Sequence, residues 1–153
     1  MEVVHTHFDG VKILKVRYFE DERGYFVETF SARSLAAAGL PSVFVQDNQS
    51  LSRTPGTLRG MHWQVAPFAQ TKLVRVACGA VLDVIVDLRP DSPTFRQHLA
   101  IELSAQNRLQ LLVPHGFAHG FLTLEPNSEV VYKVDAFYNA HCERGVHWAD
   151  PDL

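Results

Sequence analysis

This chain of 153 residues has few cysteines, no long uninterrupted apolar run and no concentration of positive charge. Two cysteines, Cys78 and Cys142, do not make a disulfide framework, and we expect two reduced thiols in a cytoplasmic protein. Charged residues interrupt even the most apolar stretch, residues 81–87, so no membrane span is predicted. The 14 Lys and Arg residues are scattered and the net charge is −3, which disfavours a nucleic-acid partner. The first seven residues lack the basic start and apolar stretch of a signal peptide.

Several patterns of common enzymes are missing as well. There is no Gly-x-Gly-x-x-Gly and no P-loop pattern, so no bound dinucleotide or ATP is implied. Ser50 and Ser52 lack the glycines of a nucleophile elbow, and Cys78 has no adjacent histidine. These absences argue against acyl transfer and redox chemistry.

The length indicates one domain, residues 1–153, large enough for a single sizeable core. Short apolar segments recur at about 8–12-residue spacing, the pattern of a sandwich or barrel. The expected strands are 11–16, 18–19, 25–30, 43–50, 72–77, 80–88, 99–103, 109–113, 120–124 and 130–134. We therefore predict an all-β, antiparallel jelly-roll barrel of cupin type whose interior holds the site.

Two local features refine this picture. One short helix is predicted over residues 31–39, with Ser31 as N-cap and Gly39 as the C-terminal stop. Cys78 and Gly79 separate two strand patterns and predict a tight hairpin turn between them.

The candidate chemistry lies in Arg59-Gly60-Met61-His62, in Lys72, and in the histidine-containing turn at residues 114–121. A lone histidine in a strand is more often structural than catalytic. Strand alternation places Arg59 and His62 on opposite faces, unless a bulge at Gly60 re-aims one of them. An imidazole with the ordinary pKa of about 6.5 suits a base near neutral pH, and a fixed ammonium suits a developing negative charge.

Neighbouring polar residues follow the same alternation. Gln64 shares a strand face with His62, and Gln70 shares one with Lys72. Asp83 and Asp87 lie within an apolar strand and need partners, for which Lys72, Arg75 and Arg89 are the candidates. Ion pairs that fix the barrel are at least as good an interpretation of these aspartates as catalysis.

A metal site is also disfavoured. Pro114-x-Gly116-x-x-His119 matches the second motif of metal-binding cupins, but their first motif needs His-x-His and a following Glu. The corresponding stretch here is His62-Trp63-Gln64, in which Gln64 is a poor ligand. We therefore expect no metal.

Taken together, the motifs resemble those of the dTDP-4-dehydrorhamnose 3,5-epimerase family over about residues 18–151. The resemblance is carried by Phe19-x-Asp21-x-Arg23-Gly24-x-Phe26-x-Glu28, Gln46-Asp47-Asn48-x-Ser50, Leu58-Arg59-Gly60-Met61-His62-x-Gln64, Gln70-x-Lys72-Leu73-Val74-Arg75-Val76, Gly79-x-Val81-x-Asp83-Val84-x-Val86-Asp87-x-Arg89, Ser92-Pro93-Thr94-Phe95 and Pro114-x-Gly116-Phe117-Ala118-His119-Gly120-Phe121. These motifs occur in the family's order.

The resemblance implies a cofactor-free isomerase of a dTDP-4-keto-6-deoxyhexose, acting in deoxysugar biosynthesis. It implies that His62 is the general base, Tyr132 the proton donor on the opposite face of the sugar, and Lys72 the cation that stabilises the enolate oxygen. The substrate-binding residues that it implies are Phe19, Arg23, Glu28, Gln46, Asn48, Arg59, His119, Tyr138 and Glu143. Among these, Phe19, Arg23 and Glu28 are expected to reach into a partner's site, because family members are homodimers that exchange N-terminal strands.

The resemblance leaves one role open. Family members carry an aspartate that pairs with the base in a tail beyond the region of Trp148-x-Asp150-Pro151. Either that tail is missing from this sequence, or Asp83 or another carboxylate orients His62, so the orienting residue is left unassigned.

Four other functions stay open at this point. A related enzyme inverts only C3 or only C5, and the same motifs serve it. A 3,4-ketoisomerase of similar fold fits the motif set less well. A catalytically silent nucleotide-sugar-binding cupin and a metal-dependent cupin oxygenase are the alternatives of other classes.

Overall fold

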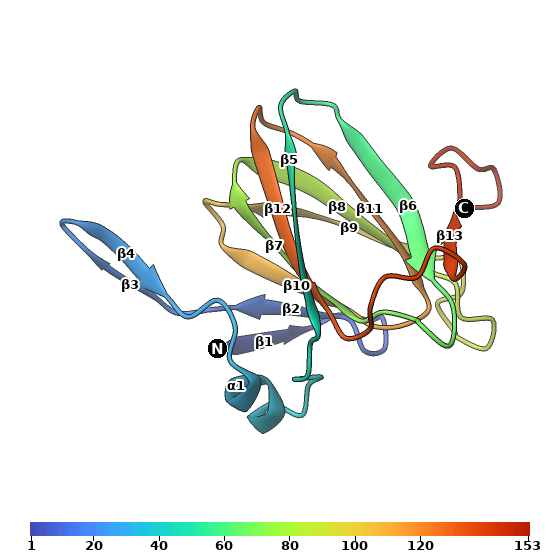
Figure 1. Ribbon diagram of the computed structural model, residues 1–153, viewed down its shortest axis with the longest axis horizontal. Coiled ribbons are helices and arrows are strands. Elements are labelled where there is room, and N and C mark those ends of the chain that lie inside the picture. Colours follow the sequence, from blue (N-terminus) through green and yellow to red (C-terminus); the bar gives the residue numbers. More distant parts are fainter.

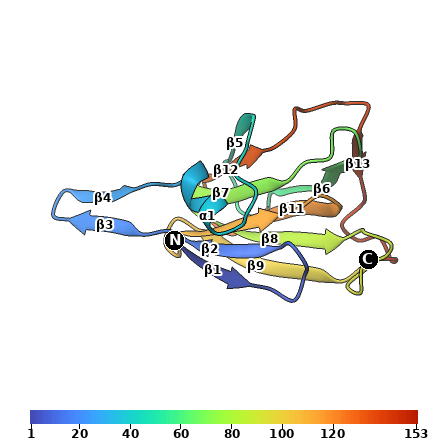
Figure 2. The same cartoon turned by 90° about the horizontal axis from the view of Figure 1, so that it is seen from below.

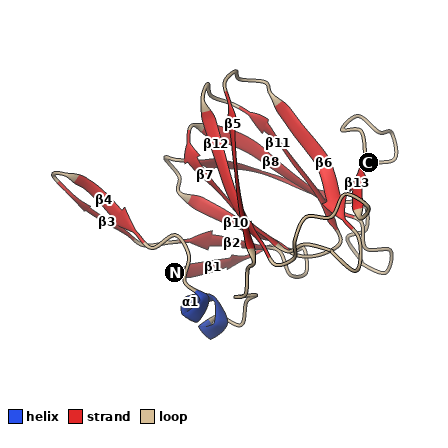
Figure 3. Cartoon of the chain, viewed as in Figure 1, coloured by secondary structure: helices blue, strands red, loops and turns tan.

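The computed structural model describes residues 1–153, and nearly all of its regular structure is β-strand (Figure 3). The strands are β1 (Glu2–His5), β2 (Lys12–Lys15), β3 (Tyr18–Asp21), β4 (Gly24–Val27), β5 (Gln46–Ser52), β6 (Leu58–Gln64), β7 (Lys72–Cys78), β8 (Ala80–Asp87), β9 (His98–Ser104), β10 (Leu109–Val113), β11 (Phe117–Thr123), β12 (Ser128–Val134) and β13 (Glu143–Gly145). The one helix, α1 (Ala32–Ala37), is far too short to cross a membrane.

Two antiparallel sheets form the body of the molecule (Figure 1). One has six strands in the order β1-β2-β10-β7-β12-β5, and the other has five in the order β13-β6-β11-β8-β9. Between them lie fully buried apolar side chains such as Val74, Ile85 and Leu111. Each contributes roughly 1.5–3 kcal/mol by leaving water. The prediction of an all-β, antiparallel jelly roll is confirmed.

Strands β3 and β4 pair only with each other and project from this body as an arm, as Figure 2 shows most clearly. Phe19, Tyr25 and Phe26 on this arm are 51%, 59% and 71% exposed. A single two-stranded hairpin has little stability of its own in water. The arm therefore exposes several aromatic side chains, and it pairs with no strand of the body.

Helix α1 follows the arm and begins and ends as predicted. Ser31 is the N-cap, and its Oγ accepts a hydrogen bond from the Ser34 N–H at 3.3 Å. Gly39 follows the helix with φ +70°, a left-handed conformation that glycine adopts without steric cost. The buried Leu35 anchors the helix to a small apolar cluster with Leu14 and Leu73.

The predicted hairpin at Cys78 and Gly79 is wrong. Strand β7 pairs with β10 and β12, whereas β8 pairs with β9 and β11, so this turn carries the chain from one sheet to the other. Gly79 has φ +72°, and a Cβ there would lie 2.5 Å from the Ser128 Oγ. A strand–turn–strand pattern does not reveal which strands pair, because pairing depends on distant segments.

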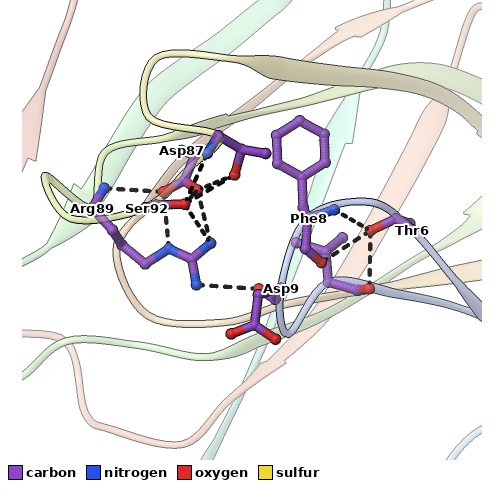
Figure 4. Close-up of polar contacts among 8 residues, drawn as sticks. Thr6, Phe8, Asp9, Asp87, Arg89 and Ser92 are labelled. Atoms are coloured by element: carbon purple, nitrogen blue, oxygen red, sulfur yellow. Dashed lines mark hydrogen bonds and ion pairs between the residues drawn. The ribbon is translucent and has the colours of Figure 1, made fainter.

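Asp87 is the centre of a structural cluster at the end of β8 (Figure 4). Its buried carboxylate accepts hydrogen bonds from Arg89 at 2.7 and 2.9 Å, from Ser92 at 2.6 Å and from Thr94 at 2.6 Å. Burial by itself would raise the pKa of Asp87, but these hydrogen bonds outweigh it and lower that pKa well below its ordinary value. Arg89 also donates to the Asp9 carbonyl at 3.1 Å, which ties the β1–β2 turn to this cluster. The ion-pair interpretation of Asp87 is confirmed.

Candidate active site

A cleft lies between the two sheets and consists of two adjoining cavities that share His62 and Tyr132. The first, of about 120 Å³, is lined by Gln46, Asn48, His62, Trp63, Gln64, Gln70, Lys72, Tyr132, Tyr138 and Glu143. The second, of about 340 Å³, is lined by Gln49, Ser50, Arg59, Gly60, His62, His119, Phe121 and Tyr132. Two cavities that meet at the same pair of side chains suit a ligand with two chemically different ends.

An irregularity in β6 brings Arg59 and His62 to the same cavity. The pairing of β6 with β11 shifts register between His119 and Phe121, next to Gly60. Gly60 has φ +113°, and a Cβ there would lie 2.6 Å from the Gly120 Cα, so no larger residue fits. The expectation that Gly60 re-aims a neighbouring side chain is confirmed.

His62 lies opposite His119 in the β6–β11 pair, with 6.4 Å between the ring centroids. Burial, the nearby Lys72 and His119 lower the pKa of His62 from 6.5 to about 3. In the free protein this pKa therefore lies below the ordinary value of an imidazole, because desolvation and the neighbouring Lys72 ammonium both disfavour the imidazolium. At neutral pH this imidazole is uncharged and able to accept a proton.

Asp83, one of the candidates for orienting His62, does not contact it. Its carboxylate contacts the Nε2 of His119 at 2.9 and 3.0 Å, and both side chains are buried. The reason lies in the sheet order, since β11 separates β8 from β6 and places His119 between the two residues. A buried carboxylate paired in this way satisfies its need for a partner.

Lys72 supplies a cation inside the cleft. It lies on the inner face of β7 and is only 4% exposed, and its Nζ is 6.0 Å from the centroid of the Tyr132 ring. Burial lowers the pKa of Lys72 to about 8, while Asp83 and Glu143 oppose the shift. The group is still mostly an ammonium ion at pH 7. A charge in such a dry place acts strongly on any negative charge that develops nearby.

Tyr132 lies on β12, across the cleft from His62. Its Cα partners are Val74 on β7 and Asn48 on β5, so the three side chains share one sheet face. Burial raises the pKa of Tyr132, an effect that Arg59 opposes and Glu143 reinforces. The phenol therefore holds its proton at neutral pH and can donate it.

The remaining predicted residues of the body surround these three. Gln46 Nε2 donates to Asn48 Oδ1 at 2.9 Å, and Tyr138 Oη donates to Glu143 Oε2 at 2.8 Å. Arg59 is held by the Ser52 hydroxyl at 3.0 Å and has its guanidinium at the second cavity. Nine of the predicted residues thus line the cleft: His62, Lys72, Tyr132, Gln46, Asn48, Arg59, His119, Tyr138 and Glu143.

Phe19, Arg23 and Glu28 are not brought to this cleft. Phe19 and Glu28 line a separate cavity beside α1. Arg23 lies at the tip of the arm, where it forms an exposed ion pair with Asp21 at 2.6 Å. Within one chain these three residues cannot contact a ligand bound between the sheets.

Trp63, Ser50 and Phe121 also line the cleft, although they were not expected to do so. Ser50 is two residues beyond Asn48 on β5, so alternation alone would have found it. Phe121 belongs to the motif at residues 114–121, but strand alternation does not separate it from other apolar core residues. No three His, Cys, Asp or Glu side chains come together as a metal site would require.

The model of the family described as dTDP-4-dehydrorhamnose 3,5-epimerase matches residues 5–153 of this chain. The chain belongs to this family. A dTDP-4-dehydrorhamnose 3,5-epimerase of Shigella flexneri is 47% identical over 154 residues, which cover all of this chain and 84% of the relative. The resemblance seen in the motifs is thereby confirmed.

Solved structures of 3,5-epimerases superpose closely on this chain. That of the Bacillus anthracis enzyme with TDP and pyrophosphate bound has a TM-score of 0.96 and 52% identity, and the match covers 99% of this chain and 87% of that one. That of the Legionella pneumophila enzyme in complex with dTDP-4-keto-L-rhamnose has a TM-score of 0.94 and 41% identity, with coverage of 99% and 80%. The first of these relatives binds TDP and the second binds dTDP-4-keto-L-rhamnose.

The geometry of the cleft can now be compared with the chemistry of a 3,5-epimerase. A neutral imidazole projects from the five-stranded sheet, and a protonated phenol and an ammonium project from the six-stranded sheet. A ring bound between the sheets meets a proton acceptor on one face and a proton donor on the other. That arrangement suits inversion at a carbon next to a carbonyl.

Proposed function

We propose that this protein is a cofactor-independent epimerase that converts dTDP-4-dehydro-6-deoxy-D-glucose to dTDP-4-dehydro-L-rhamnose by inverting C3 and C5. The observation that carries the proposal is that His62 and Tyr132 line the same two cavities from opposing sheets. The family membership and the nucleotide-bound relatives support the choice of substrate.

His62 starts the proposed reaction. Its neutral imidazole removes the proton from a carbon next to the C4 ketone, and the electron pair of the broken C–H bond moves into an enolate with its charge on the C4 oxygen. In the free protein the pKa of His62 is about 3, which makes it a weak base. The negative charges of a bound dTDP-sugar raise that pKa and strengthen the base when substrate is present.

Lys72 and Tyr132 complete the step. The Lys72 ammonium stabilises the enolate oxygen, where preorganised charge has its largest effect. Tyr132 then gives its phenolic proton to the same carbon from the other face, so the configuration inverts. His62 has gained one proton and Tyr132 has lost one, and exchange with water restores both before the second carbon reacts.

The nucleotide and its diphosphate occupy the rest of the cleft in this proposal. Gln46, Asn48, Tyr138 and Glu143 bind the nucleotide end, and Arg59 and His119 bind beside the reacting sugar. A homodimer in the cytoplasm is part of the proposal, with Phe19, Arg23 and Glu28 entering the partner's cleft. The projecting arm supports this assignment, since Phe19, Arg23 and Glu28 do not line the cleft of their own chain. Cys78 and Cys142 are unpaired, which agrees with a reducing compartment.

The test is NMR of dTDP-4-dehydro-6-deoxy-D-glucose incubated with the protein in D₂O. We expect deuterium at C3 and C5 and formation of the L-rhamno product. His62→Ala lowers the rate of deuterium uptake by about 10²–10⁴-fold, the usual contribution of a general base. Tyr132→Phe blocks product formation, and His98→Ala, a change at an exposed histidine on β9, leaves the rate unchanged.

Other outcomes point to other functions. Deuterium at a single carbon identifies a single-carbon epimerase. Wild-type protein that binds dTDP yet exchanges no hydrogen is a nucleotide-sugar-binding protein without catalysis. Either result overturns the proposed reaction.

A further inference from the structure

The segment between β12 and β13 places Tyr138 at the cleft without belonging to either sheet. Four backbone groups between Ala136 and Asn139 are instead bonded by glutamine side chains. Gln70 Nε2 donates to the Ala136 carbonyl at 2.8 Å, and Gln46 Oε1 accepts from the Tyr138 N–H at 3.1 Å. The other two groups are bonded by Gln64. The position of Tyr138 therefore depends on side chains from β5, from β6 and from the segment that precedes β7.

Gln64 makes the largest contribution to this arrangement. It is 5% exposed, and its Oε1 accepts from the Asn139 N–H at 2.7 Å. Its Nε2 donates to the Phe137 carbonyl at 3.2 Å and to the Phe68 carbonyl at 2.7 Å. Both amide hydrogens and the amide oxygen are thus used. Because the partners are one N–H and two carbonyls, the orientation of this amide is unambiguous.

Tyr138 is also held at its far end. Its hydroxyl donates to Glu143 on β13, and Glu143 is the Cα partner of Gln64 in the β6–β13 pair. The side chain of Gln64 fixes the backbone on both sides of Tyr138, while its strand partner fixes the phenol. Gln64 lies two residues from His62 on the same strand face, so one strand presents the base and positions the aromatic ring.

We propose that Gln64 is a positioning residue that, with help from Gln70, holds the Tyr138 ring where it contacts the nucleotide of the bound dTDP-sugar. This inference rests on the proposed function, because it assigns Tyr138 to the nucleotide end of the ligand. Position 64, which corresponds to a metal ligand in metal-binding cupins, would then hold a loop in place instead. An amide serves this purpose because it donates and accepts at the same time.

A carboxylate at position 64 gives the sharpest chemical contrast with the amide of Gln64. In Gln64→Glu the side chain keeps its length but places a second oxygen against the Phe68 and Phe137 carbonyls, where it repels them. Gln64→Ala removes all three hydrogen bonds and leaves the loop backbone without its buried partner. Both changes free Tyr138 and leave His62, Lys72 and Tyr132 themselves unsubstituted.

The experiment measures the dissociation constant of dTDP by calorimetry, and the steady-state constants, in two backgrounds. We expect Gln64→Ala and Gln64→Glu to raise the dissociation constant of dTDP and the KM about tenfold, with a smaller change in kcat. In a Tyr138→Ala background, Gln64→Ala has little further effect, because the ring that it positions is gone. Gln106→Ala, a change at an exposed glutamine between β9 and β10, is the matched control and leaves binding unchanged.

The same weakening by Gln64→Ala in both backgrounds indicates a general structural role and overturns the proposal. Unchanged binding in Gln64→Glu overturns it as well. If Gln64 variants fail to fold in thermal melts, Gln70→Ala is used in the same cycle, with an expected weakening of about threefold that disappears in the Tyr138→Ala background. Because dTDP binding is measured without turnover, an inactive wild type refutes the proposed reaction and still leaves this inference tested. A wild type that does not bind dTDP overturns both.

Discussion

His62 and His119 are Cα partners in the antiparallel pair of β6 and β11, yet their surroundings differ completely. His119 has a buried carboxylate, Asp83, at 2.9 Å, whereas His62 has a cation, Lys72, near it and no carboxylate within hydrogen-bonding distance. Two identical side chains on adjacent strands therefore have neighbours of opposite charge. His119 is fixed in place by its partner, and His62 stays neutral and free to take a proton.

The dependence of kcat/KM on pH follows from His62 and Lys72. The pKa of His62 is about 3 in the free protein, so this imidazole is already neutral at pH 5 and kcat/KM does not decline through it between pH 7 and pH 5. The pKa of Lys72 is about 8, so its ammonium is lost as the pH rises through 8 and kcat/KM falls. Lys72→Arg keeps the charge and moves the alkaline decline to higher pH. An acidic decline near pH 6.5 that His62→Asn abolishes contradicts this expectation.

The pair of Asp83 and His119 contributes to stability as well as to the site. Asp83→Asn replaces the charged acceptor of the buried His119 Nε2 with a neutral amide, and we expect the loss of this charge-assisted hydrogen bond to cost about 1.5–3 kcal/mol. Urea denaturation at pH 7 measures the loss. Asp47→Asn, which breaks the exposed pair with Lys133, is the control and should cost less than about 1 kcal/mol. Equal losses in the two variants contradict the assigned difference in burial.

Asp87 makes the stability of the fold sensitive to acid. Its pKa is lowered in the folded protein, so its contribution is present above the unfolded pKa of about 3.9 and is lost as the pH falls toward the folded value. At pH 7, Asp87→Asn weakens the charged hydrogen bonds and lowers the free energy of unfolding by about 1.5–3 kcal/mol. Urea denaturation at pH 3 should show a smaller difference in the free energy of unfolding between wild type and variant. If this difference stays constant from pH 7 to pH 3, the charge of Asp87 is not what stabilises the fold.

The arm of β3 and β4 gives a test of the proposed dimer. Phe26 is 71% exposed in the single chain, and Phe26→Glu places a charge where the arm is expected to dock on the partner. We expect light scattering after gel filtration to show a dimer for wild type and a shift toward monomer for the variant. Leu124→Glu, at a partly exposed residue following β11, leaves the dimer intact. A monomeric wild type removes the dimer from the proposal.

Much of the site could be inferred from local pattern. The motif around His62, the position of Lys72 and the alternation that pairs each with a neighbouring glutamine are properties of single strands, and the structure places all of them at the cleft. The helix after Ser31 could also be predicted from local sequence, because its N-cap and its glycine stop lie within nine residues. Periodicity of two along a strand is set by the backbone alone, which is why these inferences succeeded.

Other features depended on which segments meet across the fold. The assignment of β7 and β8 to different sheets, the partnership of Asp83 with His119, and the use of Gln64 as an anchor for Tyr138 all join residues distant in the chain. The low pKa of His62 has the same origin, since it comes from burial and from a lysine on the other sheet. The amino-acid sequence by itself determined which reactive groups the protein carries and which way each strand presents them. Only the tertiary structure decided their partners and their charge states, because hydrogen bonding and desolvation arise from packing between sheets rather than along a strand.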